Sequence, residues 1–236
     1  MKINTRVVVL LMGLFFGFGA FAQNPAPPQT DSRIYNIVAA TSAERIETDI
    51  RKLVSFGTRN TFSDTVSTTR GIGAARRWIK SEFEKISKDC GGCLEVFYQR
   101  DFVEKVEGSR VPFSTYVVNV VAVLRGTEYP NSYAMMSGDI DSRASNTMNF
   151  EIDAPGANDN ASGMAGTIEA ARVLSKYKFR HSIAFVGLSG EEQGLYGGAG
   201  LAKYAQENNW EIVGVLNNDM IGNIEGVDGV IDNRTF

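Results

Sequence analysis

The feature that most constrains this chain is a turn-rich loop, residues 153–163, which carries Asp159 just before a helical pattern. Pro155 and Gly156 break any regular element on the upstream side of Asp159. Downstream, apolar residues recur at helical spacing, at Met164, Ile168, Ala171 and Leu174. The pattern therefore fixes a carboxylate at a junction between a loop and a helix, where, taken alone, Asp159 would act as a helix cap.

Strand-like and helical patterns alternate along the rest of the chain. We expect helices around residues 46–54, 74–86, 164–174 and 195–204, and strands at 94–102, 116–124, 132–137, 182–187 and 212–216. Residues 127–131 resemble the turn of a hairpin that joins two of these strands. This order predicts an α/β fold with a mixed, largely parallel central sheet covered by helices on both faces.

Acidic residues follow three of the predicted strands, each time at the carboxyl end. In an open parallel sheet these ends meet at one rim, where ligands bind. Carboxylates crowded at one rim resist ionisation unless cations bind them, so the pattern predicts a cation site. Oxygen ligands alone leave calcium, magnesium, manganese and zinc open. The residues are Asp139 and Asp141 after 132–137, Glu191 and Glu192 after 182–187, and Asp219 after 212–216, with Asp159 joining them from its loop.

Three motifs, at residues 155–163 (PGANDNASG), 189–197 (SGEEQGLYG) and 217–222 (NNDMIG), resemble the co-catalytic zinc aminopeptidase family. This family includes secreted bacterial leucyl aminopeptidase-like metallopeptidases, glutamate carboxypeptidases, glutaminyl cyclases and the non-catalytic transferrin receptors. Weaker similarity lies at residues 53–59 (LVSFGTR) and at Asn119-Val120, so that the resemblance covers about residues 44–224. It implies a zinc-dependent exopeptidase, most simply an aminopeptidase, that acts on peptide or protein substrates.

The resemblance also assigns roles to individual residues. Asp159 would bridge two Zn2+ ions, Glu192 would bind one ion and Asp219 the other. Asp139 stands where the family has a histidine ligand, and Asp141 matches an acid that orients this ligand. Glu191 would be the general base, which takes a proton from the attacking water and passes it to the leaving amine. The peptide bond between Asp159 and Asn160 is expected to be cis.

Two departures from the family concern its histidine ligands. An aspartate can bind zinc at about 2.0–2.2 Å, but Asp139 adds a negative charge and is shorter than imidazole. The family's last histidine ligand would lie downstream of Asp219, whereas no histidine follows His181 before the chain ends at Phe236. We interpret residues 44–236 as the N-terminal part of a zinc peptidase domain truncated at its C-terminus. His181 itself starts a strand, roughly 20 Å from the rim, and is not expected to be a ligand.

Residues 1–22 have the pattern of a secretory signal peptide, with Lys2 and Arg6 before an apolar run and a small-residue cleavage site that ends at Ala22. They predict a secreted or periplasmic protein that has no membrane span, and residues 23–43 would form a leader. A formal net charge of -3 gives no reason to expect a nucleic acid partner. Export also favours a disulfide between Cys90 and Cys93 over a redox motif. The oligomeric state stays open.

Other functions remain possible on the same residues. A binding homologue could keep the fold and lack catalysis, which the aspartate at position 139 would favour. A glutaminyl cyclase could use a single zinc at Asp159 and Glu192. A nucleotide-binding domain is disfavoured, because the glycines at 194–200 are not followed by the lysine and hydroxyl residue of a phosphate loop.

Overall fold

The computed structural model describes residues 31–225 and 229–231. The predicted signal peptide and most of the predicted leader lie outside these residues. The described part begins with α1 (Ser32–Ala39), which lies within the predicted leader and buries none of its residues. Among the described residues, no helix combines the length and the hydropathy that a membrane span requires.

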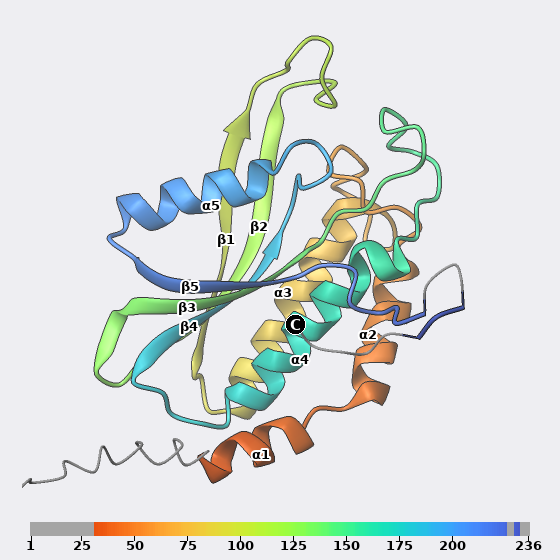
Figure 1. Cartoon of the computed structure of the whole chain (residues 1–236). Coiled ribbons are helices and arrows are strands. Elements are labelled where there is room, and N and C mark those ends of the chain that lie inside the picture. Colours follow the sequence, from red (N-terminus) through yellow and green to blue (C-terminus); the bar gives the residue numbers. More distant parts are fainter. Residues whose placement is uncertain (1–30, 226–228, 232–236) are drawn as a thin grey trace, which may run out of the picture.

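A five-stranded mixed sheet forms the centre of the molecule (Figure 1). Its order is β1 (Leu94–Val103), β2 (Thr115–Leu124), β4 (His181–Leu188), β3 (Tyr129–Asp139) and β5 (Glu211–Asn218). The β3 strand runs parallel to β4 and β5, whereas β2 pairs antiparallel with both β1 and β4. The α/β prediction is confirmed, and all five predicted strands exist.

The predicted hairpin at residues 127–131 is wrong. The β2 and β3 strands do not pair with each other, because β4 lies between them. The backbone N–H of Tyr129 instead donates to the carbonyl of Arg180, and Tyr129 pairs with His181 at the start of β4. Residues 125–128 therefore carry the chain across β4 instead of turning it back beside β2.

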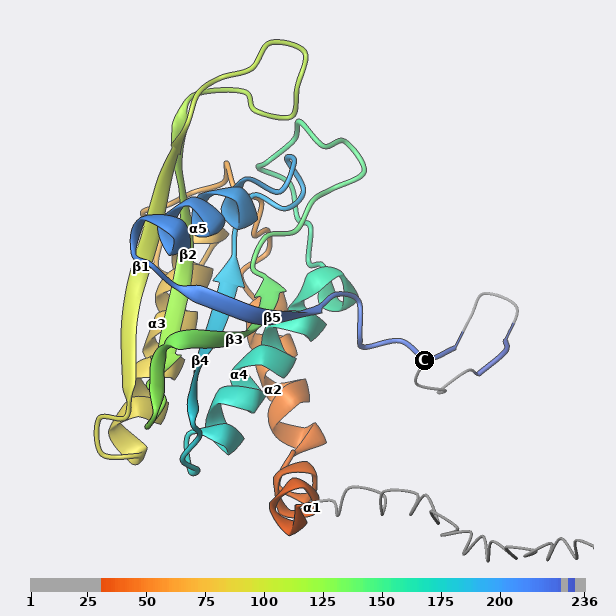
Figure 2. The same cartoon turned by 60° about the vertical axis from the view of Figure 1, so that its left-hand side comes forward.

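Helices cover the two faces of the sheet unequally (Figures 1 and 2). One face packs against α2 (Ala43–Val54), α3 (Gly71–Asp89) and α4 (Gly163–Leu174) through a large apolar core. The other face packs against α5 (Tyr196–Glu207) alone. Alternate residues of β2 pack into the two cores: Val120 and Ala122 into the core beneath α3 and α4, and Val121 and Val123 into the core beneath α5. This alternation is what a strand buried on both faces requires.

Close approach at the end of β3 brings the site together. A side chain at Gly138 would collide with the backbone of Gly163, and one at Gly163 would collide with the carbonyl of Asn218. Glycine at both positions therefore lets the ends of β3 and β5 meet the start of α4. The Cys90–Cys93 disulfide, at the opposite end of α3, is formed as predicted.

Candidate active site

Three strands place acidic residues side by side at one rim of the sheet. Asp139 is the last residue of β3 and lies opposite Leu188, the last residue of β4. Glu191 and Glu192 follow β4 by three and four residues, and Asp219 follows β5 directly. The rim predicted from the strand order is confirmed, and the metal-binding and catalytic roles of these residues stay predictions.

Asp159 reaches this rim from a single π-helical turn, Ala157–Ser162, which precedes α4. Asp159 and Asn160 interrupt this turn with non-helical backbone angles, and the peptide bond between them is cis, as the family resemblance predicts. Within residues 31–225 and 229–231, the Asp159 carboxylate accepts no hydrogen bond. It does not cap a helix, and both of its oxygens remain free for a cation.

The buried side chain of Arg59 anchors the loop that carries Asp159, a role that the sequence did not predict. Its side chain is 1% exposed. It donates to the carbonyls of Ile140 at 2.8 Å and Leu53 at 3.2 Å, and to those of Pro155 at 2.6 Å and Gly156 at 2.9 Å. Burial lowers the pKa of Arg59 to about 10, and the nearby charges of Asp141 and Asp159 oppose this shift. Arg59 therefore stays a cation at neutral pH and ties two acidic segments together.

Asn160 joins the two sides of the rim. Its Nδ2 donates to Asp139 Oδ2 at 3.0 Å and to the carbonyl of Asn218 at 2.8 Å. Its Oδ1 accepts from the backbone N–H groups of Gly163 at 3.0 Å and Met220 at 3.2 Å. With four hydrogen bonds and 1% exposure, this amide fixes the end of β3, the start of α4 and the end of β5 relative to one another.

Asp139 lies in this buried environment with 5% exposure. Burial raises the pKa of Asp139 to about 6; the hydrogen bond from Asn160 lowers it, and the charges of Glu191, Asp219 and Asp159 raise it further. Asp139, Glu191 and Asp219 line the same pocket, so their charges repel one another across it. A bound cation would remove the repulsion that disfavours their ionised forms.

Asp141 has a structural role distinct from that of Asp139. It is 1% exposed, and its two oxygens accept the backbone N–H groups of Glu191 at 3.3 Å and Glu192 at 3.2 Å. Burial, followed by the charge of Asp139, raises the pKa of Asp141 to about 7. Since both oxygens are engaged, Asp141 positions the loop that carries the two glutamates instead of binding a ligand itself.

The two glutamates differ in their partners. Glu192 Oε2 forms an ion pair with Arg143 Nε, and Arg110 donates to the backbone carbonyl of Glu192 at 2.8 Å. No described residue donates to the Glu191 carboxylate. Burial raises the pKa of Glu191, and the charge of Glu192 adds to this shift. Burial also raises the pKa of Glu192, so it is their partners that distinguish the two glutamates: a carboxylate with no fixed partner suits proton transfer, whereas an oriented carboxylate suits a ligand.

The donor set consists of carboxylate oxygens alone and suits a cation that accepts oxygen ligands. Asp139 and Glu192 each keep one oxygen without a hydrogen-bond partner in the described ranges, and Asp159 and Asp219 keep two. The residues present do not form a preassembled cage, since no group of three or more His, Cys, Asp or Glu is close enough to hold a metal ion within 31–225 and 229–231. Side chains would therefore have to converge when a metal binds.

A pocket of ≈ 340 Å³ opens at this rim, on the α5 side. The acids Asp139, Glu191 and Asp219 line one part of it, and Leu188, Leu195 and Val215 line another. His181 lies at the other end of β4, where its ring stacks on that of Tyr129 with 4.8 Å between centroids. The site therefore offers carboxylates beside an apolar wall, as ligand pockets do.

Comparisons with known proteins point to one family. Residues 119–230 match the family model of Peptidase family M28, and all the rim acids lie within this range. A probable zinc metalloprotease of Pyrenophora teres f. teres is 45% identical over 212 residues, which are 90% of this chain and 43% of that protein. A second, of Leptosphaeria maculans, is 43% identical over 209 residues, 89% of this chain and 48% of that protein. The chain thus spans less than half the length of these curated relatives.

Solved structures share the fold at lower sequence identity. LapB of Legionella pneumophila superposes with a TM-score of 0.65 at 21% identity and covers 86% of this chain and 50% of its own. A glutaminyl cyclase from an Acidobacteriales bacterium has a TM-score of 0.57 at 21% identity, with coverages of 77% and 61%. The family match, the curated relatives and the shared fold agree, and we conclude that this chain belongs to peptidase family M28.

Proposed function

We propose that the protein is a zinc metallopeptidase that hydrolyses peptide bonds at the carboxylate rim, and that it acts as an aminopeptidase. One observation carries the proposal: acids from four segments lie at the rim with oxygens that accept no hydrogen bond in the described ranges, while Asp141, whose oxygens are engaged, orients the loop of the two glutamates. The names of the curated relatives, probable zinc metalloproteases, support zinc as the cation.

Asp139, Asp159, Glu192 and Asp219 would hold the metal, in a site for two ions. Bound zinc would polarise the scissile carbonyl and lower the pKa of water. Glu191 would take the proton from the attacking water at its carboxylate and deliver it to the leaving amine. Asn160 would keep Asp139 in place, and Arg143 would keep Glu192 oriented through Oε2, leaving Oε1 for the ion.

Two substitutions at adjacent positions test these roles. Glu191→Gln should reduce hydrolysis of an aminoacyl chromogenic substrate by about 10²–10⁴-fold and leave the zinc content unchanged, because it removes a proton carrier. Glu192→Gln should lower the zinc content, measured by mass spectrometry of the dialysed protein. Equal loss of zinc in both variants would contradict the assignment.

A second candidate, a binding protein without catalysis, gains support from one contact. Arg143 already neutralises Glu192, and such a pair could persist in a protein that binds no metal. Zinc content and activity of the wild-type protein together separate the candidates: a protein with neither stoichiometric zinc nor hydrolysis of peptides would favour the binding role, whereas zinc together with hydrolysis would favour the peptidase. Release of ammonia from an amino-terminal glutaminyl peptide would instead identify a glutaminyl cyclase.

The proposed export rests on the pattern of residues 1–22. Mass spectrometry of the protein purified from its native host should find Gln23 at the amino terminus. An exported protein that retains Met1 would refute this.

A further inference from the structure

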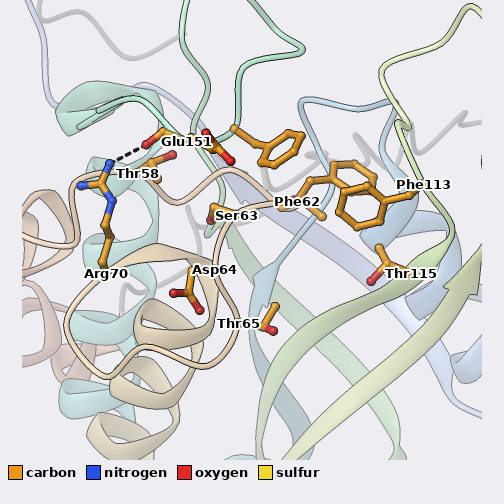
Figure 3. A pocket seen from close by; sticks show the side chains of 11 residues that line it. Thr58, Phe62, Ser63, Asp64, Thr65, Arg70, Phe113, Thr115 and Glu151 are labelled. Atoms are coloured by element: carbon orange, nitrogen blue, oxygen red, sulfur yellow. Dashed lines mark hydrogen bonds between the residues drawn. The ribbon is translucent and has the colours of Figure 1, made fainter.

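A second pocket, of ≈ 520 Å³, lies beside the rim and contains none of the rim acids (Figure 3). We call it the aromatic pocket. Its walls come from three segments: residues 58–70, the connection between β1 and β2, and the loop between β3 and α4. The lining residues are Thr58, Thr61, Phe62, Ser63, Asp64, Thr65, Arg70, Phe113, Thr115, Phe150 and Glu151.

Three phenylalanine rings form one end of the aromatic pocket. Phe113 packs edge to face against Phe62 at 5.1 Å between centroids and against Phe150 at 5.9 Å. Phe62 is 6% exposed, whereas Phe113 is 43% exposed at the pocket wall. An apolar ring left this exposed offers its edge and face to an incoming apolar group, and an aromatic group would gain most from this geometry.

The other end of the aromatic pocket is polar. Figure 3 shows Arg70 on the side away from Phe62 and Phe113, and Arg70 donates to the carbonyl of Glu151 at 2.6 Å. The hydroxyls of Thr65 and of Thr115, which lies on the side of Phe113, have no hydrogen-bond partner among residues 31–225 and 229–231. The aromatic pocket thus combines an apolar end with free hydroxyls, as an amino acid side chain and its backbone require.

Each of the three segments that supply the walls of the aromatic pocket has a residue bonded to the loop that carries the two glutamates. Thr61 Oγ1 accepts the backbone N–H of Gly190, the residue before Glu191, at 2.8 Å. Arg110, which precedes Phe113 in the connection from β1 to β2, donates to the carbonyl of Glu192. Arg143, at the start of the loop that carries Phe150, pairs with the carboxylate of Glu192.

Two buried amide side chains, next in sequence to residues that form these contacts, each have one polar atom without a hydrogen-bond partner. They are Asn60 Nδ2, next to Thr61 in sequence, and Gln193 Oε1, next to Glu192. Asn60 is 1% exposed and Gln193 is 7% exposed. Buried polar atoms without a partner are rare and often mark where a ligand or water binds. The junction between the aromatic pocket and the glutamate loop therefore has unused capacity for hydrogen bonds.

We propose that the aromatic pocket is a substrate subsite that receives an aromatic or large aliphatic side chain of a peptide whose reacting bond lies at Glu191. The proposal rests on the proposed function, since it assigns a substrate class to the same site. It makes Phe113 a specificity-determining residue, because this ring is the exposed part of the apolar wall.

Binding can be measured without any hydrolysis. The probes are N-acetyl-L-phenylalaninamide and N-acetyl-L-alaninamide, which lack the free amino terminus an aminopeptidase needs, and the readout is NMR titration of the full chain. The phenylalanine probe should bind more tightly, and Phe113→Ala should weaken it by about fivefold to tenfold, as expected for the loss of an aromatic contact. Phe102→Ala is the matched control: Phe102 is 51% exposed on β1 and pairs edge to face with Tyr116, but does not line the pocket.

The outcomes separate this inference from the proposed function. Selective loss in Phe113→Ala, with Phe102→Ala unchanged, supports the subsite even if the protein hydrolyses nothing. Equal binding of the two probes, or equal effects of the two variants, would overturn it, whatever the peptidase activity. In an active protein, Phe113→Ala should also lower kcat/KM for phenylalanine-containing peptides and leave it unchanged for alanine-containing peptides.

Discussion

The two edge strands of the sheet share a backbone architecture and differ in what covers them. The β1 strand packs against α3 on one face and α5 on the other, and buries Leu94, Gln99 and Val103. The β5 strand pairs with β3 over most of its length, yet buries no residue. Its apolar side chains lie exposed, with Val213 at 57%, Val215 at 56% and Leu216 at 68%.

The candidate site combines acids from the covered strands β3 and β4 with one acid from the exposed strand β5. Asp139, Glu191 and Glu192 follow the interior strands β3 and β4, and Arg59, Asp141 and Arg143 hold them or their loop in place. Asp219 follows β5, which pairs with β3, and its own segment is tied to the rest by hydrogen bonds that Met220 and Gly222 donate to the side chains of Asn160 and Asn158. Backbone pairing between strands therefore places an acid at the rim, whereas burial of the residues around that acid holds it in position.

The largest effect should come from Arg59, the buried cation on the covered side. Arg59→Met removes four hydrogen bonds and leaves buried carbonyls unpaired, so the free energy of unfolding should fall by about 3–5 kcal/mol. Arg51→Met is the control, because Arg51 is exposed and pairs only with Glu47 on the same helix. That substitution should cost no more than about 0.5 kcal/mol. Urea denaturation measures both, and similar losses would show that the covered side does not depend on Arg59.

The pH dependence of stability should report the burial of Asp139. Its pKa is raised to about 6 in the folded chain, above the value of about 3.9 for an exposed aspartate. Between these values the folded state binds more protons than the unfolded state, so stability falls as pH rises from about 4 to 6. With metal removed by chelation, this fall should be up to about 3 kcal/mol from Asp139.

Asp139→Asn should make this part of the profile less steep, as measured by thermal unfolding at a series of pH values, while the buried Asp141, whose pKa is raised to about 7, keeps part of the slope. Asp89→Asn, at an exposed residue at the end of α3, is the control substitution. Saturating zinc should reverse the trend, since it binds the ionised carboxylates of the folded state; at 100 times its Kd the gain is about 2.7 kcal/mol. A profile that rises with pH in chelated wild-type protein would contradict the burial of Asp139.

Sequence patterns predicted α2 to α5, the strands and the shared rim, because helical spacing, strand-like runs and strand ends are local properties; they missed α1, which lies within the predicted leader. They did not predict that β4 lies between β2 and β3, because the sequence of an apolar strand does not specify which strands pair with it. They also missed Arg59 and Asn160. The partners of these two side chains include backbone atoms such as those of Ile140, Pro155 and Met220, whose proximity arises only from the fold.

Asn160 tests whether the two sides of the rim are coupled. Asn160→Ala removes all four hydrogen bonds of its side chain and should destabilise the chain by about 2–3 kcal/mol. Asn158→Ala is the matched control, because Asn158 Oδ1 accepts only from Gly222 N at 2.9 Å and Ser162 Oγ at 3.3 Å. Its cost should be about 1 kcal/mol.

Hydrogen exchange distinguishes coupling from general destabilisation. In Asn160→Ala the amide of Met220 should lose protection, while the amides of β2 keep theirs relative to the global stability. If the Met220 amide is unprotected already in the wild-type protein, Asn160 does not fix the end of β5. The segment that carries Asp219 is then not held to the rest of the site by this hydrogen bond.

The smallest predicted difference compares one substitution on the two parts of the sheet. Val121 on β2 is 0% exposed between β1 and β4, and Val213 on β5 is 57% exposed. Val121→Ala removes buried methyl groups and leaves a cavity, at a cost of about 2 kcal/mol. Val213→Ala should cost no more than about 0.5 kcal/mol, because its side chain is already in contact with water. Both follow from urea denaturation of the same preparation. A cost at Val213 that equals the cost at Val121 would mean that something covers β5 in solution, and Asp219 would then be as firmly placed as the acids that follow β3 and β4.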